Sequence, residues 1–172
     1  MRLIAALALL LTGLLPARAD TIGKWVVDSG TGGHLFAATR NDSGNMIVHY
    51  CLEDGTCAWM LALNTRCDEG HTYPALANSD LGALPLTLRC IGPWADLNGY
   101  MFTDFKSLDD TIKAATRIGF AFPMAGDEFR VIRFDLSGAR VALDKLRERG
   151  EAQLRNKSNI SPPSRNTRDQ RL

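Results

Sequence analysis

The chain has 172 residues, a formal net charge of +1 and a hydrophobic content of 45%. This length is enough for one domain with a real core, and the nearly balanced charge gives no sign of a nucleic-acid partner. Beyond the first residues, no apolar stretch is long enough to form a transmembrane helix.

Residues 1–19 have the pattern of a secretory signal peptide. Arg2 supplies a positive charge, residues 3–15 form a short apolar run, and residues 17–19 match a small-x-small cleavage site. We therefore expect cleavage after Ala19, export, and a mature protein that is periplasmic or secreted.

The first part of the body predicts an antiparallel meander. Residues 21–27 have the composition of a strand, with Trp25 as an anchor, and residues 34–41 form the next strand. Turn signals at residues 28–33 and 41–45 follow these strands. The glycines of the first turn do not precede a helix signal, so they predict no phosphate-binding loop.

The stretch between Cys51 and Cys57 predicts a tight β-hairpin closed by its own cysteines. Residues 46–51 and 57–64 form its arms, and an Asp-Gly turn signal lies between them. With a three-residue loop, Cys51 directly faces Cys57, at a separation close to that of a disulfide.

Four cysteines remain in the exported chain, and an even number in that setting indicates two disulfides. The hairpin register favours a bond between Cys51 and Cys57, which leaves Cys67 to pair with Cys90. The pairing of Cys51 with Cys67 and of Cys57 with Cys90 remains an alternative. A zinc site is disfavoured because the spacings match no familiar C-x₂-C pair.

The middle of the body predicts a long loop followed by short strands. Residues 65–84 have a loop-like composition. Pro85 lacks the N–H group that a strand ladder needs, so we expect the next strand at residues 86–90. Residues 92–94 read as a turn, and residues 100–105 as another strand.

The last part of the body predicts two helices around a hairpin. Ser107 is the expected cap of a short helix that ends near Arg117. Residues 118–123 and 129–136 form the last hairpin, and residues 138–150 form a final helix with one apolar stripe.

The pattern as a whole predicts a mostly β fold: an antiparallel β-sandwich or partly open barrel with a short helix and a C-terminal helix. Residues 20–150 form this single β-rich domain. Residues 151–172 contain few aliphatic side chains and no aromatic ones, so we expect a disordered tail. The tail is basic and the body acidic, which would let the tail touch an anionic surface, although a solvated tail is the simpler interpretation.

The sequence resembles the invasion-associated locus B family of exported bacterial proteins. The resemblance rests on Trp25, on the pair Cys51 and Cys57, and above all on residues 129–146. There, as in the family, a last strand runs through a Leu-x-Gly step into a terminal helix. The resemblance implies a periplasmic or secreted β-rich protein, linked to host-cell invasion in some pathogens, with no catalytic residues to carry over.

No combination of side chains predicts a catalytic, cofactor or metal site. His49 faces Trp59 across the hairpin, so we expect a core or edge imidazole whose hydrogen bonds are satisfied. Two pairs of adjacent carboxylates occur, at residues 109–110 and 127–128. Adjacent residues on a helix do not face each other, so we expect the first pair to serve the helix dipole and cap. The second pair lies in a turn, and we expect its carboxylates to be solvated.

These observations favour a non-enzymatic, exported binding or interaction protein without a cofactor, whose partner is a protein or another envelope component. The alternative is a small secreted hydrolase or hydrolase inhibitor. A deep pocket with clustered polar residues would favour the enzyme. A flat or loop-lined surface with aromatic residues such as Tyr73 or Trp94 would favour interaction.

Overall fold

The computed structural model describes residues 19–123 and 129–160, and in this part of the chain ten strands and two helices occur. The elements are β1 (Asp20–Ile22), β2 (Trp25–Ser29), β3 (Leu35–Arg40), β4 (Met46–Cys51), β5 (Cys57–Leu63), β6 (Thr72–Ser79), β7 (Gly82–Trp94), β8 (Leu97–Phe102), α1 (Phe105–Ala114), β9 (Arg117–Pro123), β10 (Phe129–Asp135) and α2 (Ala139–Ile160).

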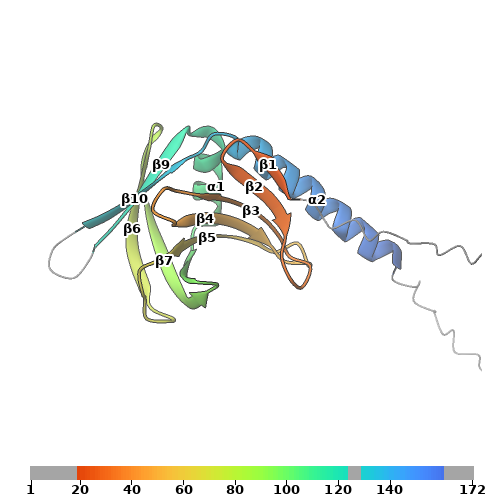
Figure 1. Ribbon diagram of the computed structural model, residues 1–172, viewed down its shortest axis with the longest axis horizontal. Coiled ribbons are helices and arrows are strands. Elements are labelled where there is room, and N and C mark those ends of the chain that lie inside the picture. The colour runs from red at the N-terminus through yellow and green to blue at the C-terminus, as the bar shows by residue number, and fades with distance from the viewer. Residues whose placement is uncertain (1–18, 124–128, 161–172) are drawn as a thin grey trace, which may run out of the picture.

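All the strands belong to one antiparallel sheet, in the order β1-β2-β3-β4-β5-β8-β7-β6-β9-β10. The sheet curls around a shared core without closing, and α1 and α2 pack against one end of it (Figure 1). Its last strand approaches its third, where Asn41 Nδ2 donates to the Arg133 carbonyl oxygen at 3.1 Å. The predicted fold class, mostly β with a short helix and a C-terminal helix, is confirmed.

The central hairpin has the register that its turn predicts. Cys51 pairs with Cys57 and His49 with Trp59. Because successive side chains of a strand point to opposite faces, every second residue of β4 and β5 enters the core. Trp59 is fully buried there and meets Trp25 edge to face, with 6.2 Å between the ring centroids.

Helix α1 begins three residues earlier than predicted, because its N-cap is Asp104 and not Ser107. The Asp104 carboxylate accepts hydrogen bonds from the Ser107 backbone N–H at 3.1 Å and from the Ser107 hydroxyl at 3.0 Å. A carboxylate serves this purpose as well as a serine hydroxyl does, so Ser107 lies in the first turn instead. The helix ends at Ala114, before the predicted end near Arg117.

Strand β6 and the start of β7 occupy the segment that was predicted to be a loop, and this prediction is wrong. Strand β6 contains Pro74 and strand β7 contains Pro85. Proline is typical of loops, and this is why the composition predicted one here. Both prolines pair within the β6–β7 ladder, but β6 meets β9 only from Leu76, and β7 meets β8 only from Leu88. A residue without an N–H group is tolerated where only one edge of the strand is paired.

Three further boundaries differ from the predictions. The expected strand at residues 21–27 is the β1–β2 hairpin, because Gly23, with a φ of 59°, reverses the chain. The expected turn at residues 92–94 is the end of β7, and the reversal comes at Ala95, with a φ of 52°. The expected strand at residues 100–105 is β8, which begins and ends three residues earlier.

The last hairpin is confirmed, since β9 and β10 pair along their whole length. Ile132 and Phe134 point into the core and Val131 is exposed, in line with the predicted alternation. The turn of this hairpin, with the carboxylates of residues 127–128, lies outside the described residues.

Helix α2 continues past Gly150, where it was expected to end, and reaches Ile160. The predicted disorder is therefore wrong for residues 151–160, whereas residues 161–172 lie outside the described part. Figure 1 shows the helix running across the end of the sheet and beyond it. No helix in the described ranges combines the length and apolar character needed to cross a membrane.

The extension of α2 is held by two loops far away in the sequence. The Gln153 side chain donates to the Gly33 carbonyl oxygen at 2.8 Å. Lys157 Nζ lies 3.3 Å from a carboxylate oxygen of Glu53, at the tip of the central hairpin. Leu154 lies over the same hairpin tip. These contacts dock part of the basic tail onto the body.

Candidate functional site

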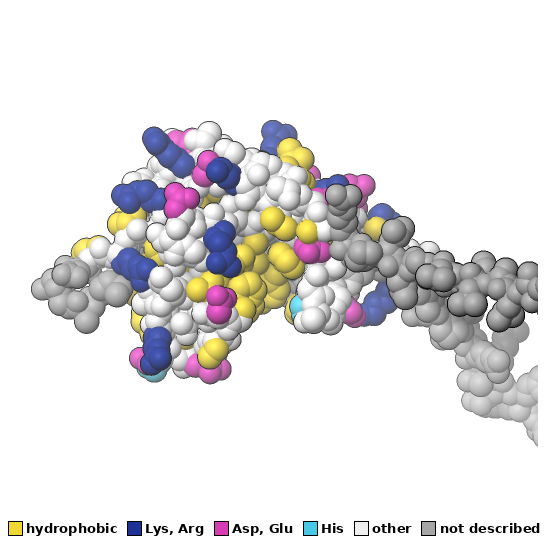
Figure 2. All heavy atoms as spheres, in the orientation of Figure 1, with side chains coloured by type: hydrophobic (Ala, Val, Ile, Leu, Met, Phe, Trp, Pro, Cys, Tyr) yellow, Lys and Arg dark blue, Asp and Glu magenta, His cyan; other side chains and the backbone are white. Residues whose placement is uncertain are grey.

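A second hydrophobic cluster lies on the outer face of the sheet, on the side away from the core. Val48 and Met60 are its buried floor, where β4 and β5 run side by side. Figure 2 shows hydrophobic side chains gathered in the middle of this face. We call the depression around them the outer-face groove. It is lined by Gly30, Thr31, His34, Phe36, Val48, Tyr50, Leu52, Met60, Ile91 and Trp94.

The groove has a volume of about 340 Å³, and its lining contains no lysine, arginine, aspartate or glutamate. Phe36 and Tyr50 are directly paired across β3 and β4, so both aromatic rings stand on this face. Trp94, at the end of β7, is half-buried beside them. The structure therefore brings the predicted surface tryptophan together with two aromatic residues that the sequence argument did not single out.

Gly99 is what lets β7 contribute to this cluster. A Cβ atom at Gly99 would lie 2.6 Å from Ile91 Cγ1 and 3.1 Å from Met60 Sδ. Because the glycine has no side chain, the Ile91 side chain occupies the space over Gly99 and packs against the cluster that contains Met60. A glycine inside a strand pattern often marks such a close approach, and this is the signal by which the cluster could have been found.

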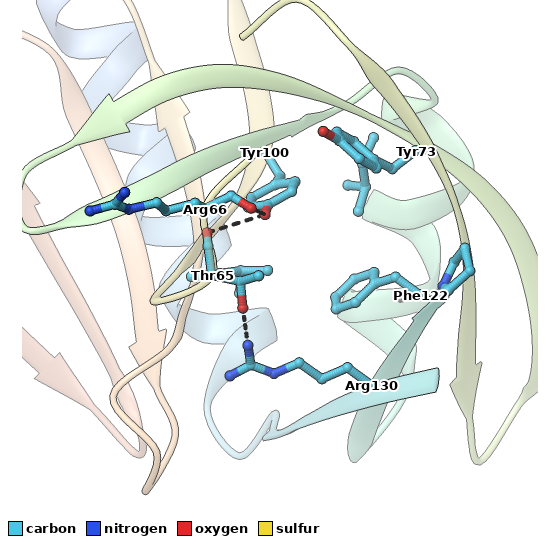
Figure 3. A pocket seen from close by; sticks show the side chains of 9 residues that line it. Thr65, Arg66, Tyr73, Tyr100, Phe122 and Arg130 are labelled. Atoms are coloured by element: carbon cyan, nitrogen blue, oxygen red, sulfur yellow. Dashed lines mark hydrogen bonds between the residues drawn. The ribbon is translucent and has the colours of Figure 1, made fainter. Parts of the chain in front are cut away.

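A smaller pocket of about 190 Å³ lies among the end of β5 and strands β6 to β10 (Figure 3). Tyr73, the other predicted surface aromatic, meets Tyr100 edge to face there, with 6.0 Å between the ring centroids. The nine residues that line the pocket are Leu63, Thr65, Arg66, Tyr73, Leu88, Tyr100, Phe122, Pro123 and Arg130.

The polar groups of this pocket hold the segment that follows β5. The Tyr100 hydroxyl donates to the Thr65 carbonyl oxygen at 3.2 Å, and burial raises the pKa of this phenol. Arg130 donates to the Thr65 hydroxyl and, at 2.7 Å, to Asn64 Oδ1. The nine lining residues include no histidine, cysteine, aspartate or glutamate, so they offer no usual general base.

His49 lies elsewhere, on the core-facing side of β4 in the central hairpin, and its predicted position in the core is confirmed. Its ring stacks on Trp59 with 4.6 Å between centroids and contacts Phe105 at 5.4 Å. The residue is 7% exposed, and burial lowers the pKa of the imidazole to about 4. Neither ring nitrogen has a hydrogen-bond partner, so the prediction that the hydrogen bonds of this imidazole are satisfied is wrong.

Asp109 was predicted to serve the helix dipole and cap, and this assignment is wrong because the side chain is buried. Its carboxylate accepts a hydrogen bond from Trp59 Nε1 at 3.3 Å and pairs with Lys113. Its neighbour Asp110 is exposed and pairs with Lys106 at 2.6 Å. The two adjacent carboxylates thus point to different surroundings and form no acid/base pair.

The four cysteines meet in the pairs that the hairpin register favoured. Cys51 is bonded to Cys57, with 4.0 Å between their Cα atoms, and Cys67 is bonded to Cys90, with 6.0 Å. The described residues contain no free cysteine. The alternative pairing is therefore wrong, and in this state the four sulfur atoms are not available as zinc ligands.

The buried imidazole predicts a loss of stability in mild acid. The pKa of His49 is about 4 in the folded protein and 6.5 when unperturbed, so between these values the unfolded chain binds more protons. Stability is therefore present above pH 6.5 and is lost as the pH falls toward 4. We expect a loss of about 2 kcal/mol between pH 7 and pH 5. The measurement is urea denaturation at both pH values.

The matched variant for this measurement is His49→Phe, which keeps an aromatic ring against Trp59 but cannot bind a proton. The carboxylates that titrate in acid are common to both proteins. The free energy of unfolding of the variant should therefore change less between pH 7 and pH 5. An equal change in both proteins would contradict a role for His49.

No protein-family model and no curated protein sequence matches this chain. Among solved structures, it is similar to the crystal structure of invasion associated protein B from Bartonella henselae, with a TM-score of 0.62. The two proteins are 17% identical, and the similarity covers 78% of this chain and 99% of the other. The chain therefore shares the fold of that protein.

Proposed function

We propose that this protein is an exported, non-enzymatic binding protein of the invasion-associated locus B family, and that it binds a protein partner through the outer-face groove. The groove is the observation that carries the proposal. It joins an apolar floor, Val48 and Met60, to aromatic walls, Phe36, Tyr50 and Trp94, on the outside of a sheet whose other face already holds the core.

The shape and chemistry of the groove favour one kind of occupant. Its volume of about 340 Å³ suits one or two large side chains, and its lining has no lysine, arginine, aspartate or glutamate to pair with a charged group that it would desolvate. Tryptophan and tyrosine are typical anchors of protein interfaces. The partner is therefore a protein that inserts an apolar or aromatic side chain next to Trp94.

Export is supported by three features. The first residues have the signal pattern, and the four cysteines are paired, which is typical of oxidising compartments. In addition, β1 begins at Asp20, the expected first residue of the mature chain, and its carboxylate pairs with Lys145 at 2.8 Å and with Arg149.

The fold shared with invasion associated protein B supports the family. In residues 19–123 and 129–160, no feature supports the hydrolase alternative.

The test compares the binding of the Trp94→Ala and Val131→Ala proteins, each recovered from the periplasm or medium. The intact mass of the recovered protein should be that of a chain that begins at Asp20. A photo-reactive residue in place of Thr31, on the groove rim, captures the partner. The purified partner is then titrated against the wild-type protein and the two variants. We expect Trp94→Ala to weaken binding roughly tenfold or more, because a buried tryptophan anchor is worth about 2 kcal/mol.

Val131 is the matched control because it is an exposed aliphatic residue that does not line the groove. Its variant should bind within about twofold of the wild type, less than 0.5 kcal/mol. Equal affinities of Trp94→Ala and the wild type, with both proteins folded, would exclude the groove as the binding surface. Recovery of the protein only from the cytosol, with Met1 retained, would exclude export.

A further inference from the structure

The inner face of the central hairpin gathers three metal-ligating side chains. One ring nitrogen of His49 and the sulfur atoms of Cys51 and Cys57 lie within 4.8 Å of one another. His49 and Cys51 are two residues apart on β4, so they share a face of the strand. Cys57 faces Cys51 from β5. It is the one such group of three found among residues 19–123 and 129–160.

The imidazole in this group lacks the hydrogen bond that a buried polar ring normally has. His49 is 7% exposed, and neither of its nitrogens has a partner. Stacking on Trp59 and contact with Phe105 fix the plane of the ring. A nitrogen held close to two sulfur atoms, with its lone pair or proton unused, is therefore placed to serve as a ligand once the sulfur atoms can also bind.

We propose that the reduced central hairpin forms a three-coordinate site for a monovalent copper ion, with the Cys51 and Cys57 thiolates and one His49 ring nitrogen as ligands. Thiolate and imidazole ligands select soft or borderline metal ions, chiefly Cu(I) and Zn²⁺. A structural zinc site needs four ligands, and the described residues add no fourth histidine, cysteine or carboxylate to this group. Cu(I) accepts three ligands.

Reduction must come first, because the two sulfur atoms are bonded to each other. A dithiol reductant attacks the sulfur of Cys57, which is more exposed than Cys51, and the Cys51 thiolate leaves. The second thiol of the reductant then releases Cys57 and closes its own disulfide, so two electrons and two protons pass to the hairpin. Binding of Cu(I) releases the two thiol protons. Strand pairing keeps the two cysteines opposite each other throughout.

The experiment uses the mature chain with Cys67→Ser and Cys90→Ser, so that only the hairpin cysteines remain. After reduction, it is titrated anaerobically with Cu(I) against a coloured chelator. We expect one ion per chain. His49→Phe in the same background should bind at least about tenfold more weakly, because it removes one of the three ligands and even the loss of a ligand's hydrogen-bond partner costs about tenfold. The Cys51→Ser/Cys57→Ser protein, titrated without prior reduction so that the Cys67–Cys90 bond stays intact, should not compete with the chelator.

X-ray absorption of the same reduced Cys67→Ser/Cys90→Ser protein, loaded with one equivalent of Cu(I), gives a second readout that does not depend on the folding of the His49 variant. Two sulfur atoms and one nitrogen around copper are expected. Coordination by sulfur alone would overturn the proposal. Equal Cu(I) affinity of the His49→Phe protein, or strong binding without Cys51 and Cys57, would also overturn it.

Discussion

Replacing Gly138 with alanine is expected to destabilise the protein by about 4 kcal/mol, because two separate costs fall on this residue. Its φ of 91° lies in the region that L-residues avoid. A Cβ atom would also lie 2.3 Å from the Ile22 carbonyl oxygen. The left-handed conformation costs about 1–2 kcal/mol, and moving packed backbone aside costs about 1–3 kcal/mol more.

The contact at Gly138 holds the two edges of the sheet together. Gly23, in the β1–β2 turn, faces it, and a Cβ there would lie 2.4 Å from the Ser137 carbonyl oxygen. The same oxygen accepts a hydrogen bond from the Lys24 backbone N–H at 3.0 Å. The first turn of the chain is thus fastened to the junction between β10 and α2, which gives a physical reason for glycine in the Leu-x-Gly step.

Gly70→Ala is the matched control, since Gly70 has a φ of 84° but no atom within 4 Å of where its Cβ would lie. It should cost only the backbone strain, about 1–2 kcal/mol. Urea denaturation of both variants gives the comparison. A Gly138→Ala protein no less stable than Gly70→Ala would show that the close approach to Ile22 does not contribute.

The parts of the fold that the sequence predicts well are those set by neighbouring residues. The β4–β5 hairpin follows from an Asp-Gly turn with cysteines at equal distances from it, and its register then places His49 against Trp59. The β9–β10 hairpin follows from the alternation of apolar side chains. In each case the pattern and the contacts that it makes lie within about twenty residues of each other.

The parts that the sequence predicts poorly depend on distant partners. Residues 151–160 have too few apolar side chains to suggest a packed helix, and their support comes from Gly33 and Glu53, more than a hundred residues earlier. Within the segment, the pair Glu151 and Arg155, four residues apart with 3.6 Å between charged atoms, was the available helix signal.

Only part of the outer-face groove could be predicted from the sequence, for the same reason. Composition singles out Trp94 and Tyr73 as aromatic residues in loop-like segments, but it does not say what they meet. Phe36 and Tyr50 could have been placed together from the strand register. Gly99 marks a close approach, but its partner Ile91 could not be named from the sequence, because that contact depends on β7 and β8 lying next to β5 in the sheet.

Replacing both Cys67 and Cys90 with serine is expected to destabilise the protein by roughly 3 kcal/mol, against roughly 2 kcal/mol for the pair Cys51 and Cys57. The reason is the length of the loop that each bond closes, since cross-linking restricts the unfolded chain more when the loop is longer. The sequence separations are 23 and 6 residues. Urea denaturation of the two double variants measures the difference.

The loss of the longer bridge should also be seen locally, between β5 and β6. Cys67 lies in this connection and is bonded to Cys90 of β7. Two backbone hydrogen bonds, from Gly70 to Cys90 and from Cys90 to His71, each 2.9 Å long, also hold the connection against β7. Those two bonds remain in the variant, so we expect faster trypsin cleavage at Arg66 while β6 stays protected within the sheet. A cleavage rate equal to that of the wild type, together with a smaller loss of stability than in the hairpin variant, would show that the loop is held by the hydrogen bonds alone.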